Sequence, residues 1–380
     1  MVIFIPREAR ADETRVPVIP ETVVRLVKRG ADVLVESGAG LACAYTDHDY
    51  TGSGATIAAL AEGLERADLV LRLNKPPIQD IHRLRRGTLH ISYLDPFSSF
   101  ELLGAFCAQG VDAIAMEMIP RTTIAQKMDA LSSQASLAGY VAVIQAAERL
   151  NQILPMMMTP AGTLKPARVF IIGCGVAGLQ AIATAKRLGA RVEAFDTRPV
   201  VEEQVQSLGA RFVKIDLGET GQTKNGYARE LTDEQRQRQQ DAMAKVLAHS
   251  DIVITTAQVF GKRAPRLVTE AMVKGMRPGS VVVDMAVETG GNVEGSRPGE
   301  DVLVNGVRIV GMTNLAGRVP IHASQMYSSN IGNLVEHFWD NETKRFRLDL
   351  SDEILKGCVI IHNGEIRNEM IKNARMAAHA

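Results

Sequence analysis

Residues 168–190 read RVFIIGCGVAGLQAIATAKRLGA, and this stretch predicts the fold of the half of the chain around it. An apolar, β-branched run leads directly into Gly173, Gly175 and Gly178, and an apolar-periodic helical pattern follows. This order of strand, glycine turn and helix is the context that a GxGxxG dinucleotide-binding motif requires. The first glycine makes the tight turn, the second lets the backbone approach a pyrophosphate, and the third lets the helix pack closely on the strand. The helix N-terminus then faces the phosphates, so we predict a dinucleotide site here.

The residues after the next predicted strand indicate which dinucleotide binds. Residues 191–195 form that strand, and Asp196 follows it, 18 residues after Gly178. A carboxylate at this position accepts hydrogen bonds from the adenosine ribose hydroxyls and repels a 2′-phosphate, which favours NAD(H). Arg198 points the other way, because an arginine near this position can accommodate the 2′-phosphate of NADP(H). Since Asp196 ends the strand where the ribose must lie, NAD(H) is the predicted cofactor.

Outward from this motif, short apolar runs alternate with amphipathic helical patterns, which predicts an α/β fold of parallel sheets covered by helices. A long helical pattern over residues 131–150 separates two series of predicted strands. The first series lies at residues 2–5, 32–35, 68–73, 88–92 and 113–116, and the second at 167–172, 191–195, 211–215, 251–255, 280–284 and 308–310. We therefore predict two doubly wound, Rossmann-like domains joined by a long helix.

The domain boundaries follow from the long helix and from the tail. The tail holds one good helical pattern at residues 323–339, and we expect it to have little core of its own and to pack back onto the first domain. The expected first domain is therefore discontinuous, with residues 1–135 and 322–380. Residues 136–321 form the expected NAD(H)-binding domain.

The composition excludes several classes of protein. A chain of 380 residues is long for one compact domain. Lys plus Arg and Asp plus Glu are equal at 43 each, so no excess charge indicates a nucleic-acid or anionic-membrane partner. The four cysteines form no CxxC pair, which fits a reducing compartment, and the eight histidines form no HxH or HxxxH pair that would indicate a metal site. No stretch approaches the ~20 apolar residues that span a bilayer, so we expect a chain that is soluble on its own.

Polar residues also follow the predicted strands of the first domain. Arg15, Lys75 and Asp95 each come after a strand, and the carboxyl ends of parallel strands meet at one sheet edge. Singly, each is more often a solvated surface charge, but together they are expected to line an interdomain cleft. Residues 118–134 read MIPRTTIAQKMDALSSQ and are denser in polar groups.

Within this segment, helix capping accounts for only part of the pattern. Asp129 and Ser132 lie three residues apart at a predicted helix start, so one of them is explained as a cap. Capping does not explain Arg121 and Gln126 in the preceding loop. All four side chains could hold a nicotinamide carboxamide and its ribose through charge-assisted hydrogen bonds.

Three further positions in the second domain are candidates. Ala257 and Gln258 follow the strand at 251–255, at the edge where α/β sheets bind ligands. Glu288 follows the strand at 280–284 and is either a catalytic carboxylate or a turn residue that faces water. Residues 217–240 are polar, and they form either a solvated loop leading into a helix or a mobile lid with Tyr227 as its apolar anchor.

With these motifs, the chain resembles the NAD(H)-binding component of proton-translocating nicotinamide nucleotide transhydrogenase, nearly end to end to about residue 365. The motifs are PRTTIAQKMDALSSQASLAGY (120–140), PMMMTPAGT (155–163), GCGVAGLQAIATAKRLGA (173–190), NGYAREL (225–231), TTAQVFGKRAP (255–265) and VDMAVETGGN (283–292). Two features depart from the family pattern. Cys174 stands where a valine or alanine is expected, a change that should be harmless, and the tail after Arg367 is not recognisable.

Alanine dehydrogenase, a relative with the same two-domain plan, is the alternative. An amino-acid dehydrogenase needs an acid–base group beside its substrate. Where alanine dehydrogenases carry a histidine and an aspartate, this chain has Asp95 and Glu288, although Arg15 and Lys75 resemble their carboxylate-binding pair. Hydride transfer between two nicotinamides needs no such base, only close, oriented and dry apposition. The NGYAREL insert also matches the transhydrogenase mobile loop, so transhydrogenase is the favoured hypothesis.

The resemblance implies a role for each matching residue. Arg121, Asp129 and Ser132 would position the nicotinamide end of NADH, and Gln126 would lie at the face that meets the NADP(H)-binding partner. The adenosine ribose would be held by Asp196, Thr197 and Arg198, the pyrophosphate by Cys174, Gly175 and Val176, and the mobile loop would close with Gly226 and Tyr227.

The resemblance also implies partners and a reaction. The chain would form a homodimer on a membrane-spanning proton-channel subunit, at the inner face of the bacterial plasma membrane, beside a separate NADP(H)-binding domain. As a component of a Re/Si-specific transhydrogenase, it would pass hydride from NADH to NADP⁺, coupled elsewhere to inward proton translocation. A third hypothesis is a non-catalytic NAD-sensing module. Only the transhydrogenase subunit would need an NADP(H)-binding protein for turnover.

Overall fold

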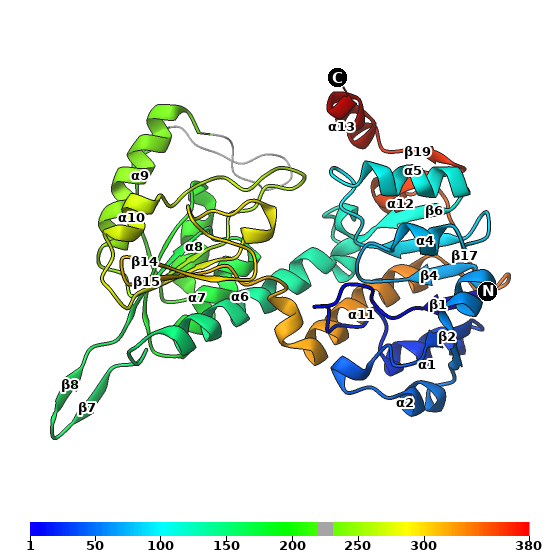
Figure 1. The fold of residues 1–380 in the computed structure, drawn as a ribbon, viewed down its shortest axis with the longest axis horizontal. Helices are drawn as coiled ribbons and strands as arrows, with labels where there is room; N and C mark the ends of the chain where they lie inside the picture. The colour runs from blue at the N-terminus through cyan, green and yellow to red at the C-terminus, as the bar shows by residue number, and fades with distance from the viewer. Residues whose placement is uncertain (219–230, 380) are drawn as a thin grey trace. The chain divides into compact units, whose positions relative to one another are not determined.

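The computed structural model describes residues 1–218 and 231–379. The expectations for Gly226 and Tyr227 fall on residues outside this description. The chain divides into two compact units, of which unit 1 contains Met1–Gln134 and Gly317–Ala380 and unit 2 contains Ala135–Ala316 (Figure 1). The boundaries expected from the sequence lie one and five residues further along the chain. Helix α6 (Ala130–Arg149) begins in unit 1 and continues into unit 2, one residue earlier at each end than the predicted helix.

Unit 1 is built on an eight-stranded sheet with the order β19-β18-β6-β5-β4-β1-β2-β3. Strands β1 to β6 are all parallel, and their order, 3-2-1-4-5-6, is that of a doubly wound sheet. Its strands are β1 (Val2–Ile5), β2 (Asp32–Glu36), β3 (Thr56–Ala58), β4 (Leu69–Leu71), β5 (Leu89–Ser92), β6 (Asp112–Ala115), β18 (Val359–His362) and β19 (Glu365–Ile366). Its helices are α1 (Pro20–Lys28), α2 (Asp47–Gly52), α3 (Leu60–Arg66), α4 (Ile78–Ile81), α5 (Phe100–Gln109), α11 (Pro320–His337), α12 (Glu353–Cys358) and α13 (Glu369–His379).

The tail contributes more to unit 1 than the sequence predicts. Strand β18 pairs antiparallel with β6, and β19 pairs antiparallel with β18. Val359, Ile360 and Ile361 are buried, as are Leu355 and Cys358 of the preceding helix. The expectation of a tail with little core is therefore wrong. The apolar run of β18 is only four residues long, and it becomes core because it extends a sheet whose other strands come from the start of the chain.

Unit 2 has a seven-stranded sheet with the order β11-β10-β9-β12-β13-β15-β14. Strands β9 to β13 and β15 are parallel in the same doubly wound order, and β14 pairs antiparallel at the edge. Its strands are β9 (Arg168–Ile172), β10 (Arg191–Phe195), β11 (Arg211–Phe212), β12 (Ile252–Thr255), β13 (Val281–Asp284), β14 (Asp301–Val304) and β15 (Val307–Val310). Its helices are α7 (Val176–Arg187), α8 (Glu202–Ser207), α9 (Asp233–Leu247) and α10 (Glu270–Lys274).

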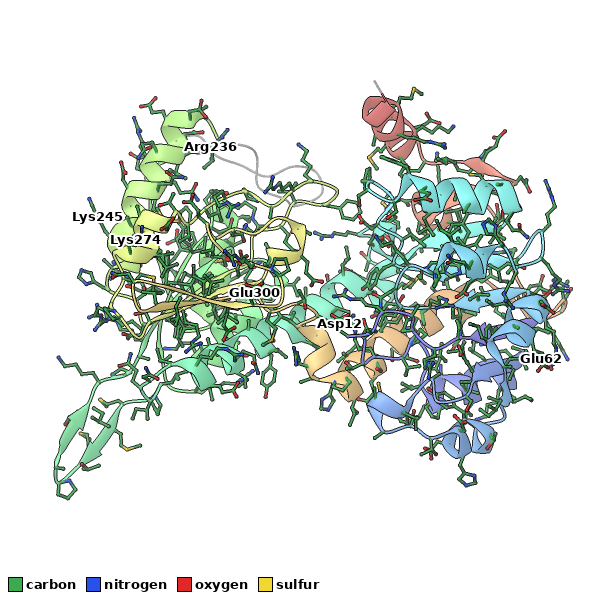
Figure 2. All side chains as sticks on the ribbon, viewed as in Figure 1. Asp12, Glu62, Arg236, Lys245, Lys274 and Glu300 are labelled. Atoms are coloured by element: carbon green, nitrogen blue, oxygen red, sulfur yellow. The ribbon has the colours of Figure 1, made fainter. Side chains whose placement is uncertain are left out.

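The sheet of unit 2 is buried on both faces, as parallel sheets generally are. Val169 and Ile171 of β9 belong to one apolar cluster, which also contains residues of α6 and α7. Phe170 and Ile172 belong to a second cluster with residues of α9 and α10. The predicted fold class, two α/β domains with mainly parallel sheets joined by a long helix, is confirmed. Charged side chains such as Glu62, Lys245 and Lys274 lie on the outer surfaces of the units (Figure 2).

A two-stranded hairpin projects from unit 2 (Figure 1). Its strands are β7 (Met157–Thr159) and β8 (Gly162–Leu164), and every residue of both is exposed. Sequence periodicity did not predict this hairpin. Within residues 1–218 and 231–379, no helix combines the length and the apolarity needed to cross a membrane.

Candidate dinucleotide-binding site

The glycine turn after β9 brings three backbone segments into close approach. Gly173 has a positive φ of 96°, a conformation that favours glycine. A Cβ atom on Gly178 would lie 1.9 Å from the carbonyl oxygen of Gly173, so α7 can approach β9 this closely only without a side chain there. A Cβ on Gly175 would meet no heavy atom within 4 Å. The space beside Gly175 is therefore open to a ligand, whereas Gly178 is needed for packing.

Helix α7 begins directly at this open space. Gly175 is its N-cap and offers no side-chain cap to the first turn. The N–H groups at the start of a helix lack intrahelical partners and, with the helix dipole, favour an anion. Val176, the first helical residue, is 45% exposed, which is unusual for a valine in a core helix. This arrangement suits the pyrophosphate of a dinucleotide.

Asp196 joins the glycine turn to the end of β10. The backbone N–H of Cys174 donates to Asp196 Oδ2 at 2.8 Å. Arg198 donates to the same carboxylate through Nε at 2.9 Å and Nη2 at 2.7 Å, and its backbone N–H donates to Oδ1 at 2.8 Å. These bonds raise the pKa of the Arg198 guanidinium above its ordinary value, so it is charged throughout the working pH range. Thr197, between the two, is half-buried.

Cys174 occupies the turn as a small apolar group. Its side chain is 1% exposed, and its thiol donates to the carbonyl of Phe195 at 3.6 Å. Burial raises the pKa of this thiol well above its ordinary value. It is therefore a neutral thiol at physiological pH.

The loop after β12 is tied to the same turn. Thr256 Oγ1 donates to the carbonyl oxygen of Gly173 at 2.9 Å. Ala257 donates its backbone N–H to Asn292 Oδ1 at 3.0 Å, and Asn292 Nδ2 donates back to the Ala257 carbonyl at 2.8 Å. Gln258 is exposed and donates to the Met285 carbonyl at 3.1 Å. Asn292 thus clamps the Ala257 peptide from both sides.

Asp284, at the end of β13, holds Asn292 in turn. It is fully buried and accepts the backbone N–H groups of Ala286 at 3.0 Å and of Asn292 and Val293 at 3.1 Å each. Sequence reasoning missed both Asp284 and Asn292. The available signal was that VDMAVETGGN places a charged residue at the end of an apolar strand and an amide after a Gly-Gly turn, where side chains commonly bind backbone.

Glu288 lies in the same loop, in the short helical turn Val287–Thr289. It is exposed, and its Oε2 accepts the backbone N–H of Asn314 at 3.2 Å. This is the placement of a surface turn residue, one of the two interpretations that the sequence left open.

The candidate nicotinamide residues lie in one stretch of unit 1. Asp129 accepts the N–H of Ser132 at 2.9 Å and its hydroxyl at 2.6 Å, which caps the start of α6. Arg121 and Gln126 are both exposed, the latter in the short helical turn Ala125–Met128. Ile124 between them is 63% exposed, an apolar side chain on a polar surface.

The charges that follow the first strands of unit 1 fall into two pairs. Arg15 makes a two-pronged ion pair with Glu13, with Nε–Oε1 and Nη2–Oε2 distances of 2.7 Å each. Lys75 Nζ lies 3.4 Å from Asp95 Oδ2, and both side chains are about half exposed. The sequence indicated one sheet edge for these residues but did not predict how they pair.

Glu117, which sequence reasoning also missed, binds the backbone at Asp95. Its Oε1 accepts the backbone N–H groups of Leu94 at 2.8 Å and Asp95 at 2.6 Å. Burial raises the pKa of this carboxyl to about 7. No signal in the sequence separates it from an ordinary surface glutamate.

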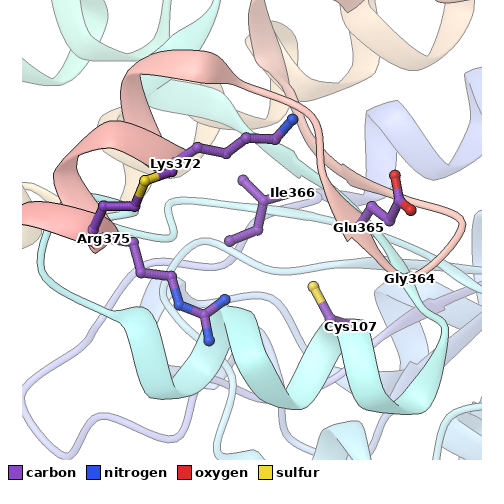
Figure 3. A pocket seen from close by; sticks show the side chains of 7 residues that line it. Cys107, Gly364, Glu365, Ile366, Lys372 and Arg375 are labelled. Carbon is purple, nitrogen blue, oxygen red and sulfur yellow. The ribbon is translucent and has the colours of Figure 1, made fainter. Parts of the chain in front are cut away.

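Unit 1 also has a pocket of about 440 Å³ between α5, β19 and α13 (Figure 3). Its lining includes Cys107, Ile366 and Arg375 and none of the residues predicted to bind a cofactor. Burial raises the pKa of the Cys107 thiol, which does not favour a reactive thiolate. Among the described residues, no group of His, Cys, Asp or Glu could hold a metal ion.

Comparison with known families agrees with this architecture. Residues 4–138 match the family described as "Alanine dehydrogenase/PNT, N-terminal domain", and residues 142–369 match "Alanine dehydrogenase/PNT, C-terminal domain". Because both domain types occur in this order and together span most of the sequence, the chain belongs to the alanine dehydrogenase/PNT family.

Individual relatives refine this assignment. The first portion of NAD(P) transhydrogenase subunit alpha, a separate chain in Rhodospirillum rubrum, is 44% identical over 374 residues, which covers 96% of this chain and 97% of that protein. The crystal structure of transhydrogenase from Sinorhizobium meliloti matches with a TM-score of 0.87 at 44% identity, covering 96% of this chain and 100% of that one. Alanine dehydrogenase of Mycolicibacterium smegmatis is more distant, 31% identical over 302 residues, with 78% of this chain and 76% of that one covered. The resemblance to transhydrogenase inferred from the motifs is confirmed.

Proposed function

We propose that this chain is the NAD(H)-binding component of a proton-translocating transhydrogenase, which passes hydride directly from NADH to NADP⁺ held by a partner domain. Proton translocation would be coupled elsewhere in the assembly. The observation that carries the proposal is the open space at Gly175 before the uncapped start of α7, beside the Asp196 carboxylate. The 44% identity to a transhydrogenase alpha subunit over 96% of the chain supports this choice of activity.

The residues of unit 2 fit the adenosine half of NADH. Gly173, Cys174, Gly175, Val176 and Gly178 would hold the pyrophosphate, because their backbone can be approached closely and α7 presents its N-terminus there. The adenosine ribose would lie at Asp196, Thr197 and Arg198, and the clamped loop of Ala257 and Gln258 would border the site. Gly226 and Tyr227 would act in the mobile loop, as the resemblance implies.

The nicotinamide end would be positioned by residues of unit 1. When bound, NADH supplies the hydride, so the protein must orient and dry the ring, and it need not move a proton. Asp129 and Ser132 are held by two mutual hydrogen bonds at the start of α6, which makes them a rigid platform. Arg121 and Gln126 are exposed beside Ile124, and we propose that this surface meets the NADP(H)-binding partner.

The alternative activity is that of an alanine-dehydrogenase-like enzyme. It would require Asp95 to replace the missing histidine as an acid–base group. The ion pair of Asp95 with Lys75 and the backbone bond from Asp95 to Glu117 engage this residue on both sides, which favours a structural role. We therefore retain this activity only as an outcome of the test below.

The test begins with the purified chain, titrated with NADH and then given NADH, pyruvate and ammonium. Tight NADH binding without oxidation, followed by reduction of NADP⁺ once an NADP(H)-binding partner domain is added, is the expected result. Steady NADH oxidation by pyruvate and ammonium alone would instead establish an amino-acid dehydrogenase. Binding without turnover even with the partner would indicate an NAD-sensing module.

Shortening Gln126 should separate binding from transfer. Gln126→Asn is expected to leave the NADH dissociation constant nearly intact and to slow hydride transfer in the reconstituted complex by roughly 10- to 100-fold, because a small misplacement of reacting groups has a large effect. Stopped-flow transfer rates and an NADH titration measure the two effects. Gln206→Asn, on the exposed face of α8, is the matched control and should change neither. Equal losses in binding and rate for Gln126→Asn would refute this division of labour.

We also propose that the chain forms a homodimer and that the β7–β8 hairpin lies in its interface. An isolated two-stranded hairpin is marginally stable in water, and this one exposes four large apolar side chains. They are Met156 (60% exposed), Met157 (45%), Met158 (73%) and Leu164 (52%). With a membrane-spanning proton-channel subunit as the further partner, the dimer would be attached to the inner face of the bacterial plasma membrane.

Light scattering tests the homodimer directly. The purified chain should show twice its 41.2 kDa chain mass, and Met158→Lys combined with Leu164→Lys should shift it toward the monomer, because charges would be buried in an apolar interface. Leu303→Lys changes an equally exposed side chain on the edge strand β14 and should leave the mass unchanged. A doubly substituted hairpin that remains dimeric would place the interface elsewhere.

A further inference from the structure

The carboxylate of Asp196 is already fully engaged within the protein. A carboxylate offers about four hydrogen-bond positions on its two oxygens. Oδ1 accepts the backbone N–H and the Nε of Arg198 at 2.8 and 2.9 Å, and Oδ2 accepts the backbone N–H of Cys174 and the Nη2 of Arg198 at 2.8 and 2.7 Å. The guanidinium of Arg198 therefore fills two of the positions that a ribose diol would need.

Only those two positions can be vacated without disturbing the fold. The bond from Cys174 belongs to the glycine turn after β9, and the backbone bond from Arg198 stabilises the turn after β10. The guanidinium is the terminus of a long side chain, and it can leave the carboxylate while its own backbone N–H keeps it tethered there. A bound ribose would thus displace the guanidinium but leave a fixed positive charge beside the ribose hydroxyls.

The charge of this pair bears on which nucleotide is accepted. An unpaired carboxylate at this position repels a 2′-phosphate. Here the Asp196 side chain is 6% exposed and paired at 2.7 Å with Arg198, so the net charge of the pair is close to zero. A released guanidinium can also bind a phosphate with two parallel hydrogen bonds.

We propose that Arg198 is a specificity-determining residue, and that by neutralising Asp196 it lets 2′-phosphorylated dinucleotides of the NADP(H) class compete for the NAD(H) site. This inference rests on the proposed function. It adds that selection for NAD(H) at this site is a graded preference, whose size depends on Arg198, and that NADPH at high concentration inhibits the chain at its own nucleotide site.

The test measures the ratio of the NADPH to the NADH dissociation constant by fluorescence titration of the full chain. Arg198→Gln removes the charge, and the ratio should rise by at least about tenfold, the size of one charge-assisted hydrogen bond. Arg198→Lys keeps the charge without the planar fork, and the ratio should stay within about threefold of the wild-type value. Arg211→Gln disrupts another ion pair of the same sheet, that with Glu193, and should leave the ratio unchanged.

The possible outcomes separate this inference from the proposed function. An unchanged ratio in Arg198→Gln, or an equal weakening of both nucleotides, overturns the specificity role. If Arg198→Gln does not fold, Asp196→Asn carries the test, since loss of the repelling carboxylate should lower the ratio by about tenfold. A ratio that stays or rises in Asp196→Asn also overturns the role. Failure of the wild-type chain to bind NADH would refute the proposed function itself, whatever the ratio.

Discussion

Gly178→Ala should abolish measurable NADH binding and lower the free energy of unfolding by roughly 3 kcal/mol, the upper range for overpacking a tight contact. The new Cβ would lie 1.9 Å from the carbonyl oxygen and 2.9 Å from the carbonyl carbon of Gly173. Both contacts are with backbone, so α7 must move away from β9 or the glycine turn must deform. Either response displaces the N-terminus of α7, which the pyrophosphate would need. Urea denaturation and an NADH titration measure the two effects.

Two other glycines serve as controls for this substitution. A Cβ on Gly175 meets nothing within 4 Å, so Gly175→Ala should leave the unfolding free energy nearly unchanged and weaken NADH binding, because the methyl group enters the open space. Gly104, inside α5, also has open space around it. Gly104→Ala should stabilise the chain by about 0.5–1 kcal/mol and leave NADH binding unchanged. If Gly178→Ala bound NADH normally, the close approach of α7 to β9 would not be needed for the site.

Asp284→Ala should destabilise unit 2 by about 3–5 kcal/mol, because it leaves three buried backbone N–H groups without acceptors. These groups belong to Ala286, Asn292 and Val293. Asn292 would then lose its fixed position, and with it the clamp on Ala257 beside the glycine turn. NADH binding should therefore weaken even at temperatures where the chain stays folded. Chemical denaturation and nucleotide titration at low temperature check both effects.

The graded variant and a surface control sharpen this prediction. Asp284→Asn retains one acceptor oxygen and should lose about 1–2 kcal/mol, less than the alanine variant. Glu300, an exposed carboxylate in the same unit (Figure 2), pairs across the surface with Arg297. Glu300→Ala should stay within about 0.5 kcal/mol of the wild-type stability. A loss below about 1 kcal/mol for Asp284→Ala would contradict the role given to this carboxylate.

Features that depend on neighbouring residues could be predicted from the sequence. The glycine turn is one, because strand, turn and helix occupy a single stretch and each glycine has its own steric reason. The long helix α6 is another, since its apolar pattern extends over its whole length. The order of the central strands also followed, because consecutive βα units wind in one direction.

Features that depend on distant partners could not be predicted. Asn292 acts on a peptide 35 residues earlier, and nothing in its local sequence names that partner. Strand β18 adds to a sheet edge formed by residues near position 113. The hairpin at PMMMTPAGT has no alternation of buried and exposed positions, since both its strands are exposed throughout, and so it leaves no period to detect.

The pairing of Asp196 with Arg198 lies between these cases. The spacing of two residues identified both side chains as relevant to the cofactor, but with opposite implications. The structure joins them in one ion pair, so the two implications are no longer independent. The preference of the site then depends on the pair as a unit.

The cysteine in the glycine turn has a consequence for oxidative chemistry. Peroxide and alkylating agents attack the thiolate form of cysteine. Cys174 is 1% exposed and its pKa is raised by burial, so the reactive form is scarce and shielded. Thiol-specific reagents should leave it unmodified in the native chain, as mass spectrometry after labelling can check. A cysteine at the nucleotide turn therefore gives the site a tight, apolar filler without making nucleotide binding respond to oxidants.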